Sequence, residues 1–419
     1  MGSLSYLSFF YFGISILGAL VGTYIKFPPL LLILPIMFYK RPRFAMFIFL
    51  FILANILTVP NVDLKDTEFV GSVKAVNSGS SVLNLSYFDG KNWKKLNFDV
   101  NIYSEEPLGT IVYAKGELRK TTSHPRYYIK PTFYATTTDY NSFINKTYLQ
   151  FDSFRSFANA IDPFYQNLFG KSARDDDFVK SGLYHIFCVS GMHVSLLYIF
   201  SLSLAGLFTY KKIPKILIAL IFPTIFVIGS GMNIPSIRAL LMIYLWTLLR
   251  VLDIKINPIN LVSLVGIAMV LSEPGIALSL SFYMTFFATL GVFASTNNIT
   301  ANIGGFLGSS PFVALIGSVN PFSIIATMLV SFPVEIVMFG LTAAYIFYSI
   351  KLYAISSLIL YGLQPFSWFT KAVAHIFSKL PSLPNHFIIS LAFAATFAIY
   401  LMWSEHAKSN VEDNALTSL

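Results

Sequence analysis

Long apolar runs separated by short polar turns occupy both ends of the 419-residue chain. A helix needs about twenty predominantly apolar residues to cross a lipid bilayer. Runs that meet or approach this length lie at about 4–24, 27–39, 44–60, 183–209, 214–231, 236–251, 257–272, 275–295 and 384–403. The second run is short and rich in proline, so a re-entrant segment is an alternative there. Residues 296–320 contain no charge and many small residues, and we interpret them as a loop that dips into the protein. With further segments after residue 320, the pattern predicts a polytopic α-helical membrane protein with about ten helices.

Between residues 66 and 138 the pattern changes to short segments rich in Val, Tyr, Phe, Ile and Thr. Such segments, separated by turn residues, are typical of β-strands. Asp89 and Gly90, between the second and third segments, form the best hairpin signal. Five short strands predict a small soluble β-barrel over residues 61–140, and an OB-like fold is the natural five-stranded candidate.

Residues 141–180 place aromatic and aliphatic residues at roughly helical spacing among charged ones. This pattern predicts amphipathic helices, and the aromatic residues favour a position along the membrane interface. Asp175, Asp176 and Asp177 are three adjacent carboxylates in this segment. They suit a divalent cation, but at a helix start they also compensate the helix dipole, and we favour that capping role.

Composition agrees with a membrane protein, since hydrophobic residues make up 55% of the chain and the mean hydropathy is +0.66. The net charge of +9 does not gather in the soluble region. Residues 1–60 carry four basic and no acidic residues, whereas residues 61–180 carry fifteen basic and fourteen acidic ones. Most of the excess therefore flanks helices, as the positive-inside rule expects. A single cysteine excludes an intrachain disulfide.

The same rule predicts an orientation in the bacterial inner (cytoplasmic) membrane. The basic cluster at residues 40–43 is expected in the cytoplasm, between the N-terminal helices of residues 1–60. The next helix then leads outward, so that residues 61–140 are extracytoplasmic. Residues 181–404 form the main multi-pass domain, and residues 405–419 form a cytoplasmic tail.

Basic and aromatic residues gather in two connections of the predicted barrel. They are Lys91, Trp93, Lys94, Lys95, Arg119, Lys120, Arg126, Tyr127, Tyr128 and Lys130. Cations that meet phosphates, beside rings that stack on bases, are what single-stranded nucleic acid binding uses. A solvated barrel rim explains the same residues without a ligand, because the nearly neutral domain attracts a polyanion weakly. The residues alone favour the solvated rim.

Three charged residues fall inside or beside the C-terminal apolar segments: Arg238, Glu273 and Glu335. Ionisable residues within a bilayer are functional candidates by default. For Arg238, snorkelling from near a helix start is an equal alternative. Glu335 follows Pro333, where a broken helix leaves backbone groups that need partners, and a structural salt bridge to Arg238 is an alternative role.

The stretch from Lys180 to Leu197 embeds His185, Ser190, Gly191 and His193 in an apolar run. On an unbroken helix the two histidines lie about 12 Å apart along the axis, too far to share a metal ion. A helix break at Ser190 and Gly191 would bring them together, but no HExxH-like ligand spacing supports zinc, so we predict no metal and no cofactor. A serine near a histidine also suits an intramembrane serine hydrolase, although the first glycine of a GxSG motif is missing. Small and polar residues that allow close helix packing and line an aqueous path fit the composition better.

These motifs together resemble the ComEC family of competence proteins, the inner-membrane channels for DNA uptake. The residues that carry the resemblance are Gly182, Leu183, His185, Ser190, Gly191 and His193 in the histidine motif, then Pro235, Arg238 and Ala239, then Glu273, Pro274, Ser281 and Phe282. They occur in family order, although the family usually has aspartate where Glu273 stands. Many members also continue into a metallo-β-lactamase-like domain, whose HxHxDH motif this sequence lacks.

The resemblance implies a non-enzymatic channel that translocates single-stranded DNA during natural transformation. The implied DNA path consists of His185, Ser190, Gly191, His193, Arg238, Glu273, Ser281, Phe282 and Glu335, and DNA contact by the barrel rim becomes the favoured interpretation. The expected partners are single-stranded DNA, a periplasmic DNA receptor, a cytoplasmic ATP-driven motor or single-strand-binding proteins, membrane lipid, and further copies in a homo-oligomer. A motor is expected because the sequence has no GxxxxGK[ST] phosphate loop. An intramembrane hydrolase using Ser190 and a small-solute transporter remain the alternatives.

Overall fold

The computed structural model describes residues 2–25, 27–38, 40–58, 64–77, 79–121, 125, 127–138, 142–170, 175–187, 189–295 and 297–417. The chain divides into two compact units, Met1–Ser153 with Ser201–Ser279, and Phe154–Phe200 with Leu280–Leu419. The chain passes between the units at three positions, of which two fall inside helices and the third precedes Leu280, so the units do not follow the domain boundaries expected from sequence. Each unit is described by itself below.

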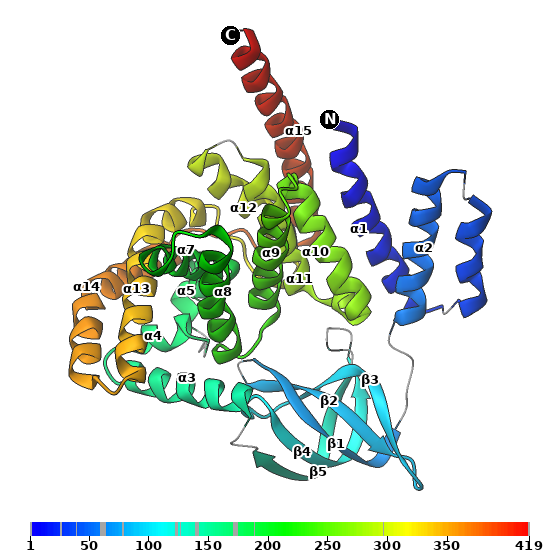
Figure 1. The fold of residues 1–419 in the computed structure, drawn as a ribbon, viewed down its shortest axis with the longest axis horizontal. Coiled ribbons are helices and arrows are strands. Elements are labelled where there is room, and N and C mark those ends of the chain that lie inside the picture. The colour runs from blue at the N-terminus through cyan, green and yellow to red at the C-terminus, as the bar shows by residue number, and fades with distance from the viewer. Residues whose placement is uncertain are drawn as a thin grey trace. The chain divides into compact units, whose positions relative to one another are not determined.

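The first unit combines a β-sheet domain with helices (Figure 1). Its strands are β1 (Leu64–Asn77), β2 (Ser80–Phe88), β3 (Trp93–Ile102), β4 (Thr110–Lys120) and β5 (Tyr127–Thr138). Its helices are α1 (Gly2–Gly22), η1 (Pro29–Phe38), α2 (Pro42–Leu57), the first part of α3 (Phe143–Asn159), the last part of α7 (Gly191–Phe208), α8 (Lys212–Gly229), α9 (Ile234–Val251), α10 (Pro258–Ser272) and η2 (Pro274–Leu278).

The five strands form a closed barrel in the order β1-β2-β3-β5-β4 (Figure 1). All neighbouring strands are antiparallel except β3 and β5, which are parallel and pair over Val100–Tyr127 and Asn101–Tyr128. The predicted sheet domain is therefore confirmed. Phe69, Leu83 and other alternate apolar residues of the strands fill its core, which explains why β-branched and aromatic residues dominate this part of the sequence.

The barrel is attached to the helices of its own unit through the turn between α8 and α9. The backbone N–H of Val76 donates a hydrogen bond of 2.8 Å to the carbonyl oxygen of Gly231. Gly231 has a φ of +96°, and a Cβ there would lie 2.7 Å from the Val76 carbonyl oxygen. Only glycine suits both constraints. The ring of Phe151 occupies the space that a side chain at Gly229 would need, so the first part of α3 is packed against α8.

The second unit is helical. It contains the remainder of α3 and of α7, together with α4 (Pro163–Leu168), α5 (Asp176–Lys180), α6 (Tyr184–Phe187), α11 (Leu280–Ala294), α12 (Asn298–Ile316), α13 (Ser323–Ser349), α14 (Tyr353–Ser378) and α15 (Phe387–Thr417). Helix α12 corrects our expectation of a loop at residues 296–320. Its charge-free run of small residues permits close helix packing, because a Cβ at Gly304 would lie 2.3 Å from the Gly291 carbonyl oxygen on α11.

Six helices of the described chain are long and apolar enough to span a membrane. They are Tyr184–Phe208 (α6 and α7 taken together), Lys212–Gly229, Ile234–Val251, Asn298–Ile316, Ser323–Ser349 and Phe387–Ser404. Four more apolar helices, Leu7–Gly22, Pro42–Leu57, Pro258–Ser272 and Leu280–Ala294, are shorter. The expected count of about ten spanning helices is thus not matched. A fifteen-residue helix reaches only about 22 Å, which is less than the roughly 30 Å of a bilayer core.

Residues 142–170 and 175–180 contain the helices expected between the barrel and the histidine motif. The carboxylate of Asp175 accepts hydrogen bonds from the backbone N–H groups of Asp177 and Phe178 at the start of α5, so the capping role of this acidic cluster is confirmed. Phe154, Phe164 and several other aromatic residues of this segment are buried in protein. Their burial shows that much of the apolar face packs on other parts of the chain; a position at the membrane interface stays a prediction.

Candidate nucleic-acid interface and membrane motifs

The histidine motif is broken between α6 and α7, as its serine and glycine suggested. His193, on the first turn of α7, is completely buried, and its Nδ1 accepts a hydrogen bond of 3.1 Å from the backbone N–H of Ser190. In a neutral ring the proton must then sit on Nε2. This buried Nε2 has no hydrogen-bond partner among the described residues. The lone pair that would activate the Ser190 hydroxyl is therefore already engaged, and this geometry does not favour a serine hydrolase.

The first glycine of the motif has a structural role. Gly182 has a φ of +78°, and a Cβ there would lie 2.6 Å from Cβ of Ser323 at the start of α13. Asn320 fixes the same turn: its side-chain amide donates to the carbonyl oxygens of Lys180, at 3.1 Å, and Phe377, at 2.9 Å. Sequence reasoning missed Asn320, because its partners lie 140 and 57 residues away.

The other predicted path residues have different environments. Arg238, on α9, is 5% exposed, and its Nε and Nη1 have no hydrogen-bond partner among the described residues. It is therefore buried rather than snorkelling. Phe282 is also completely buried, whereas Ser281 is exposed. Glu335 is half-buried on α13; it belongs to the second unit and Arg238 to the first, so their pairing stays a prediction. Phe282 packs in the core of its unit, as His193 and Arg238 are also buried, and the assignment of these residues to a DNA path stays a prediction.

Glu273 contacts the barrel. At the end of α10, its carboxylate lies 3.4 Å from Nζ of Lys74 on β1. Lys74 also forms an ion pair with Asp99 on β3. Burial of the Asp99 carboxyl, followed by the nearby charge of Glu273, raises the pKa of Asp99 to about 6, although Lys74 opposes the shift. One lysine thus holds two carboxylates where the barrel meets the helices of its own unit.

We expect Asp99 to make the stability of the protein decrease as the pH rises from about 4 to about 6. The folded-state pKa lies above the unfolded value of about 3.9, so the folded protein binds more protons in this window and loses that advantage as they dissociate. The total effect is on the order of 2 kcal/mol. Thermal unfolding of the detergent-purified chain across this window measures it.

The Asp99→Asn variant should lose this slope, because the amide does not titrate. Asp66→Asn is the matched control, since Asp66 is an exposed carboxylate 3.9 Å from a lysine, and it should keep the wild-type slope. Equal slopes in wild type and Asp99→Asn would contradict the assignment of the titration to Asp99.

The barrel residues predicted to contact nucleic acid form two groups at opposite ends of β3. Lys91, Trp93, Lys94 and Lys95 lie at the β2–β3 hairpin, where Trp93 packs against Phe88 with ring centroids 5.4 Å apart. Arg119, Lys120, Tyr128 and Lys130 lie on β4 and β5. Because Tyr127 and Tyr128 pair with Val100 and Asn101 near the far end of β3, about seven residues, or roughly 23 Å, separate the groups.

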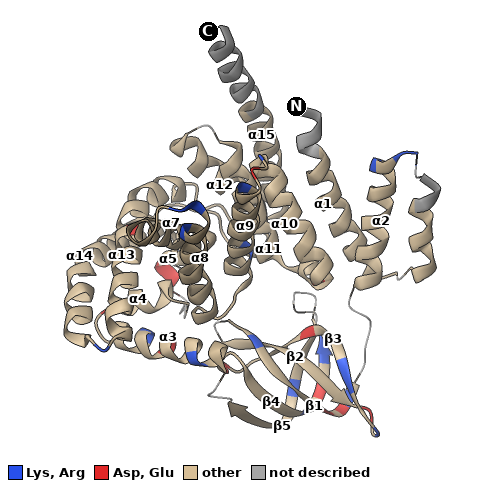
Figure 2. Ribbon diagram, in the orientation of Figure 1, with Lys and Arg blue, Asp and Glu red and all other residues tan. Residues whose placement is uncertain are grey.

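Several of these cations are already paired within the barrel. Nζ of Lys94 lies 2.5 Å from the Asp89 carboxylate, and Nε of Arg119 lies 2.9 Å from the Glu117 carboxylate. Figure 2 shows basic and acidic residues interleaved on the strands rather than separated into a patch of one sign. The barrel is therefore electrostatically mixed, and a ligand there needs contacts besides net charge.

One of the predicted rim residues, Tyr127, lies in the core of the barrel. Tyr127 is 1% exposed and packs against Phe98 with ring centroids 5.0 Å apart. Its assignment to the rim is wrong, since its position on β5 points it into the core together with Ile129. Arg126 lies outside the described residues.

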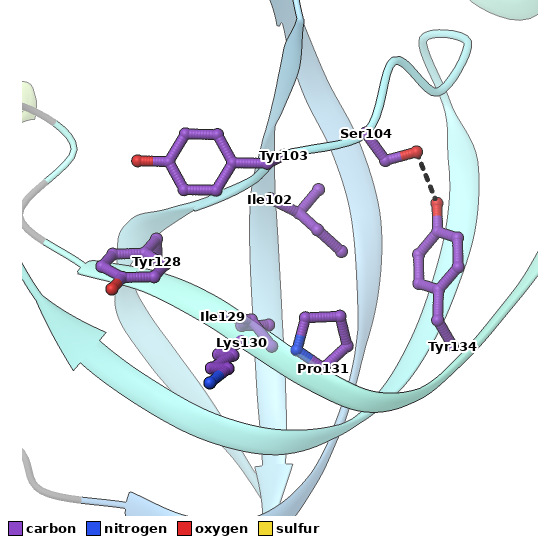
Figure 3. Close-up of a pocket in the computed structure, with 8 residues that line it drawn as sticks. All are labelled: Ile102, Tyr103, Ser104, Tyr128, Ile129, Lys130, Pro131 and Tyr134. Atoms are coloured by element: carbon purple, nitrogen blue, oxygen red, sulfur yellow. Dashed lines mark hydrogen bonds between the residues drawn. The ribbon is translucent and has the colours of Figure 1, made fainter.

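A cavity of about 300 Å³ opens beside the parallel joint between β3 and β5. Figure 3 shows its lining: Ile102, Tyr103, Ser104, Tyr128, Ile129, Lys130, Pro131 and Tyr134. The rings of Tyr103 and Tyr128 meet edge to face, with centroids 5.5 Å apart. Sequence reasoning found Tyr128 and Lys130 but missed Tyr103, which follows β3, and Tyr134, which lies within β5.

Comparison with known proteins finds similarity in the part of the chain that contains the helical motifs. Residues 171–407 match the competence protein family. The chain belongs to this family. It is also 28% identical, over 179 residues, to an uncharacterised protein of Aquifex aeolicus (strain VF5); the match covers 39% of this chain and 42% of that relative. The chain thus spans less than half the length of the curated relative it matches. No solved structure matches.

The family match places the part of the chain shared with known proteins in its helical region. The matched residues include the histidine motif, Arg238, Glu273 and Glu335. The barrel strands, which end at Thr138, lie before the matched range. Together with the six apolar helices, family membership indicates a membrane protein. Because the family match does not cover the barrel, any role of the barrel has to be inferred from the barrel's own residues.

Proposed function

We propose that this competence family protein is a channel that carries single-stranded DNA across the bacterial inner membrane during natural transformation. The observation that carries the proposal is the family match over residues 171–407, which includes all six of the described helices that are long and apolar enough to span a membrane. A polyanion that crosses a low-dielectric slab needs a hydrated path with occasional donors. His193 and Arg238 offer buried N–H groups without partners among the described residues, and such donors suit a path that opens for the strand.

The OB-like barrel, in this proposal, lies outside the cytoplasm and receives the strand from a periplasmic DNA receptor. A cytoplasmic ATP-driven motor or single-strand-binding proteins then draw the strand inward, since the sequence has no phosphate loop. Lipid surrounds the apolar helices, and the channel is either a single chain or a homo-oligomer. In this proposal the chain acts as a channel and not as an enzyme, and the family match supports DNA rather than a small solute as the transported substrate.

The test is DNA internalisation in a strain that lacks the gene. Fluorescent DNA should stop outside the cytoplasm in the deletion strain and enter it again when the wild-type protein is restored. The Gly191→Trp variant should remain at the deletion level, because a bulky ring at the start of α7 obstructs the proposed path. Ser190→Ala should internalise DNA nearly as well as wild type, because a channel needs no nucleophile.

Leu207→Trp is the matched control, since Leu207 lies on the same helix and is highly exposed. Immunoblots of membranes establish that every variant is present at equal amounts. Normal internalisation by Gly191→Trp would contradict the assignment of the path to this motif. Complete loss with Ser190→Ala, at normal protein level, would instead favour the hydrolase.

A further inference from the structure

The parallel joint between β3 and β5 leaves part of the barrel wall without strand pairing. The two strands pair over only two residues each, whereas β5 pairs with β4 along the whole length of β4. Beyond Asn101, β3 ends at Ile102, while β5 continues through Ile129 and Pro131 as far as Thr138. The two strands diverge there, and the cavity of about 300 Å³ occupies the space between them (Figure 3).

The floor and walls of this cavity suit a flat aromatic ring. Ile102 and Ile129 are buried core residues and form its apolar floor. Tyr103 and Tyr128 stand on one side (Figure 3), and Tyr103 is 70% exposed. A large exposed ring next to a second ring offers a stacking surface that the fold itself does not use. The volume lies at the lower end of the range for small-molecule sites, so it suits a single base rather than a larger ligand.

Charge gives the cavity two chemically different sides. On the side opposite the paired tyrosines (Figure 3), Ser104 and Tyr134 both donate hydrogen bonds to the Glu106 carboxylate, with a distance of 2.8 Å from Ser104. A phosphate is repelled there, while an N–H group of a base, such as N3–H of thymine, finds acceptors. Lys130 lines the other side, and Arg119 pairs across the sheet with Tyr128. Cations beside the tyrosines suit the sugar–phosphate backbone.

We propose that this cavity binds one unpaired base of single-stranded DNA, stacked on Tyr103 and Tyr128, with the adjacent phosphates beside Lys130 and Arg119. This inference rests on the proposed function and names the contact through which the barrel holds its substrate. A duplex cannot use the cavity unless a base leaves the helix, because paired bases are stacked. The site therefore selects for the single-stranded form, which net charge alone cannot do.

The test measures binding of two labelled oligonucleotides to the full chain in detergent by fluorescence anisotropy. One is oligo-dT, and the other is an abasic strand of equal length with the same phosphates. Wild type should bind oligo-dT more tightly than the abasic strand. Tyr103→Ala combined with Tyr128→Ala should weaken oligo-dT binding about tenfold, as expected for the loss of base–aromatic stacking, and leave abasic binding unchanged.

The matched control removes a similar pair elsewhere on the barrel. Tyr113 and Phe133 meet edge to face with centroids 6.0 Å apart and do not line the cavity, so Tyr113→Ala with Phe133→Ala should bind both strands as wild type does. Equal affinity of wild type for the two strands, or an unchanged oligo-dT affinity after loss of Tyr103 and Tyr128, overturns the base site while leaving the channel intact. Absence of binding to either strand overturns the barrel's role in the proposed function as well.

Discussion

Substitution of Gly304 by leucine is expected to prevent stable folding of the second unit. A Cβ at Gly304 would lie 2.3 Å from the carbonyl oxygen of Gly291, and a Cβ at Gly291 would lie 2.0 Å from the carbonyl oxygen of Gly304. The neighbouring atoms belong to backbone, which cannot turn aside as a side chain can. Helices α11 and α12 must therefore separate by more than an ångström. We expect a loss of more than about 3 kcal/mol, beyond the usual cost of overpacking.

Gly305 provides the control on the same helix. A Cβ there would lie 3.2 Å from a methyl group of Val292, which can shift by a few tenths of an ångström. Thermal unfolding in detergent and the amount of protein in the membrane should show Gly305→Ala close to wild type. Gly304→Ala should be clearly destabilised, and Gly304→Leu should be nearly absent from the membrane. Equal stability of the two alanine variants would show that this helix contact is not as close as described.

The second large effect is expected from Asp162→Ala. Asp162 is buried and caps α4 by accepting a hydrogen bond of 2.9 Å from the backbone N–H of Phe164. The same carboxylate accepts a hydrogen bond of 2.5 Å from Ser367 and lies 3.0 Å from Nζ of Lys371, both on α14. Alanine removes the cap and leaves two polar groups on α14 without their partner. Because the Lys371 side chain is 43% exposed, we expect about 2–3 kcal/mol rather than the full cost of breaking a buried pair.

Two lysine variants separate the ion pair from the cap. Lys371→Met leaves the buried Asp162 without its cation and should lower the thermal stability measurably. Lys212→Met removes an exposed pair, 3.1 Å from Asp253, and should cost less than about 1 kcal/mol. If Asp162→Ala unfolds at the wild-type temperature, then α4 and α14 are not held together through this carboxylate.

The barrel strands and the cap of α5 could be predicted from sequence because each depends on residues that lie close together in the chain. Along a strand, apolar residues that face the core alternate with residues that face outward. At the start of α5, the acceptor Asp175 precedes the donors Asp177 and Phe178 by two and three residues. Tyr127 was misplaced although a local signal existed: it shares its strand face with Ile129, two residues away, and that face fills the core.

Other features depend on distant residues and could not be predicted. Glu273 and Lys74 are 199 residues apart, and Asp162 and Lys371 are 209 apart, so no spacing rule connects them. Helix α12 was interpreted as a loop because glycine and serine disfavour helices in water. Against a neighbouring apolar helix the same small residues allow backbones to touch, and that packing outweighs their low helix propensity.

The hydrogen bond between Val76 and Gly231, with the ion pair of Lys74 and Glu273, ties the barrel to helices of its own unit at several points. These contacts hold the barrel against the helices, so the barrel is not connected to them by a flexible linker alone. Under the proposed function, a DNA strand captured on the barrel would meet those helices in an intramolecular step, at an effective concentration that does not depend on how much DNA surrounds the cell. Capture and entry then depend differently on DNA concentration. Dilution of the DNA lowers the rate at which the barrel captures a strand, but it does not change the rate at which a captured strand enters the helices.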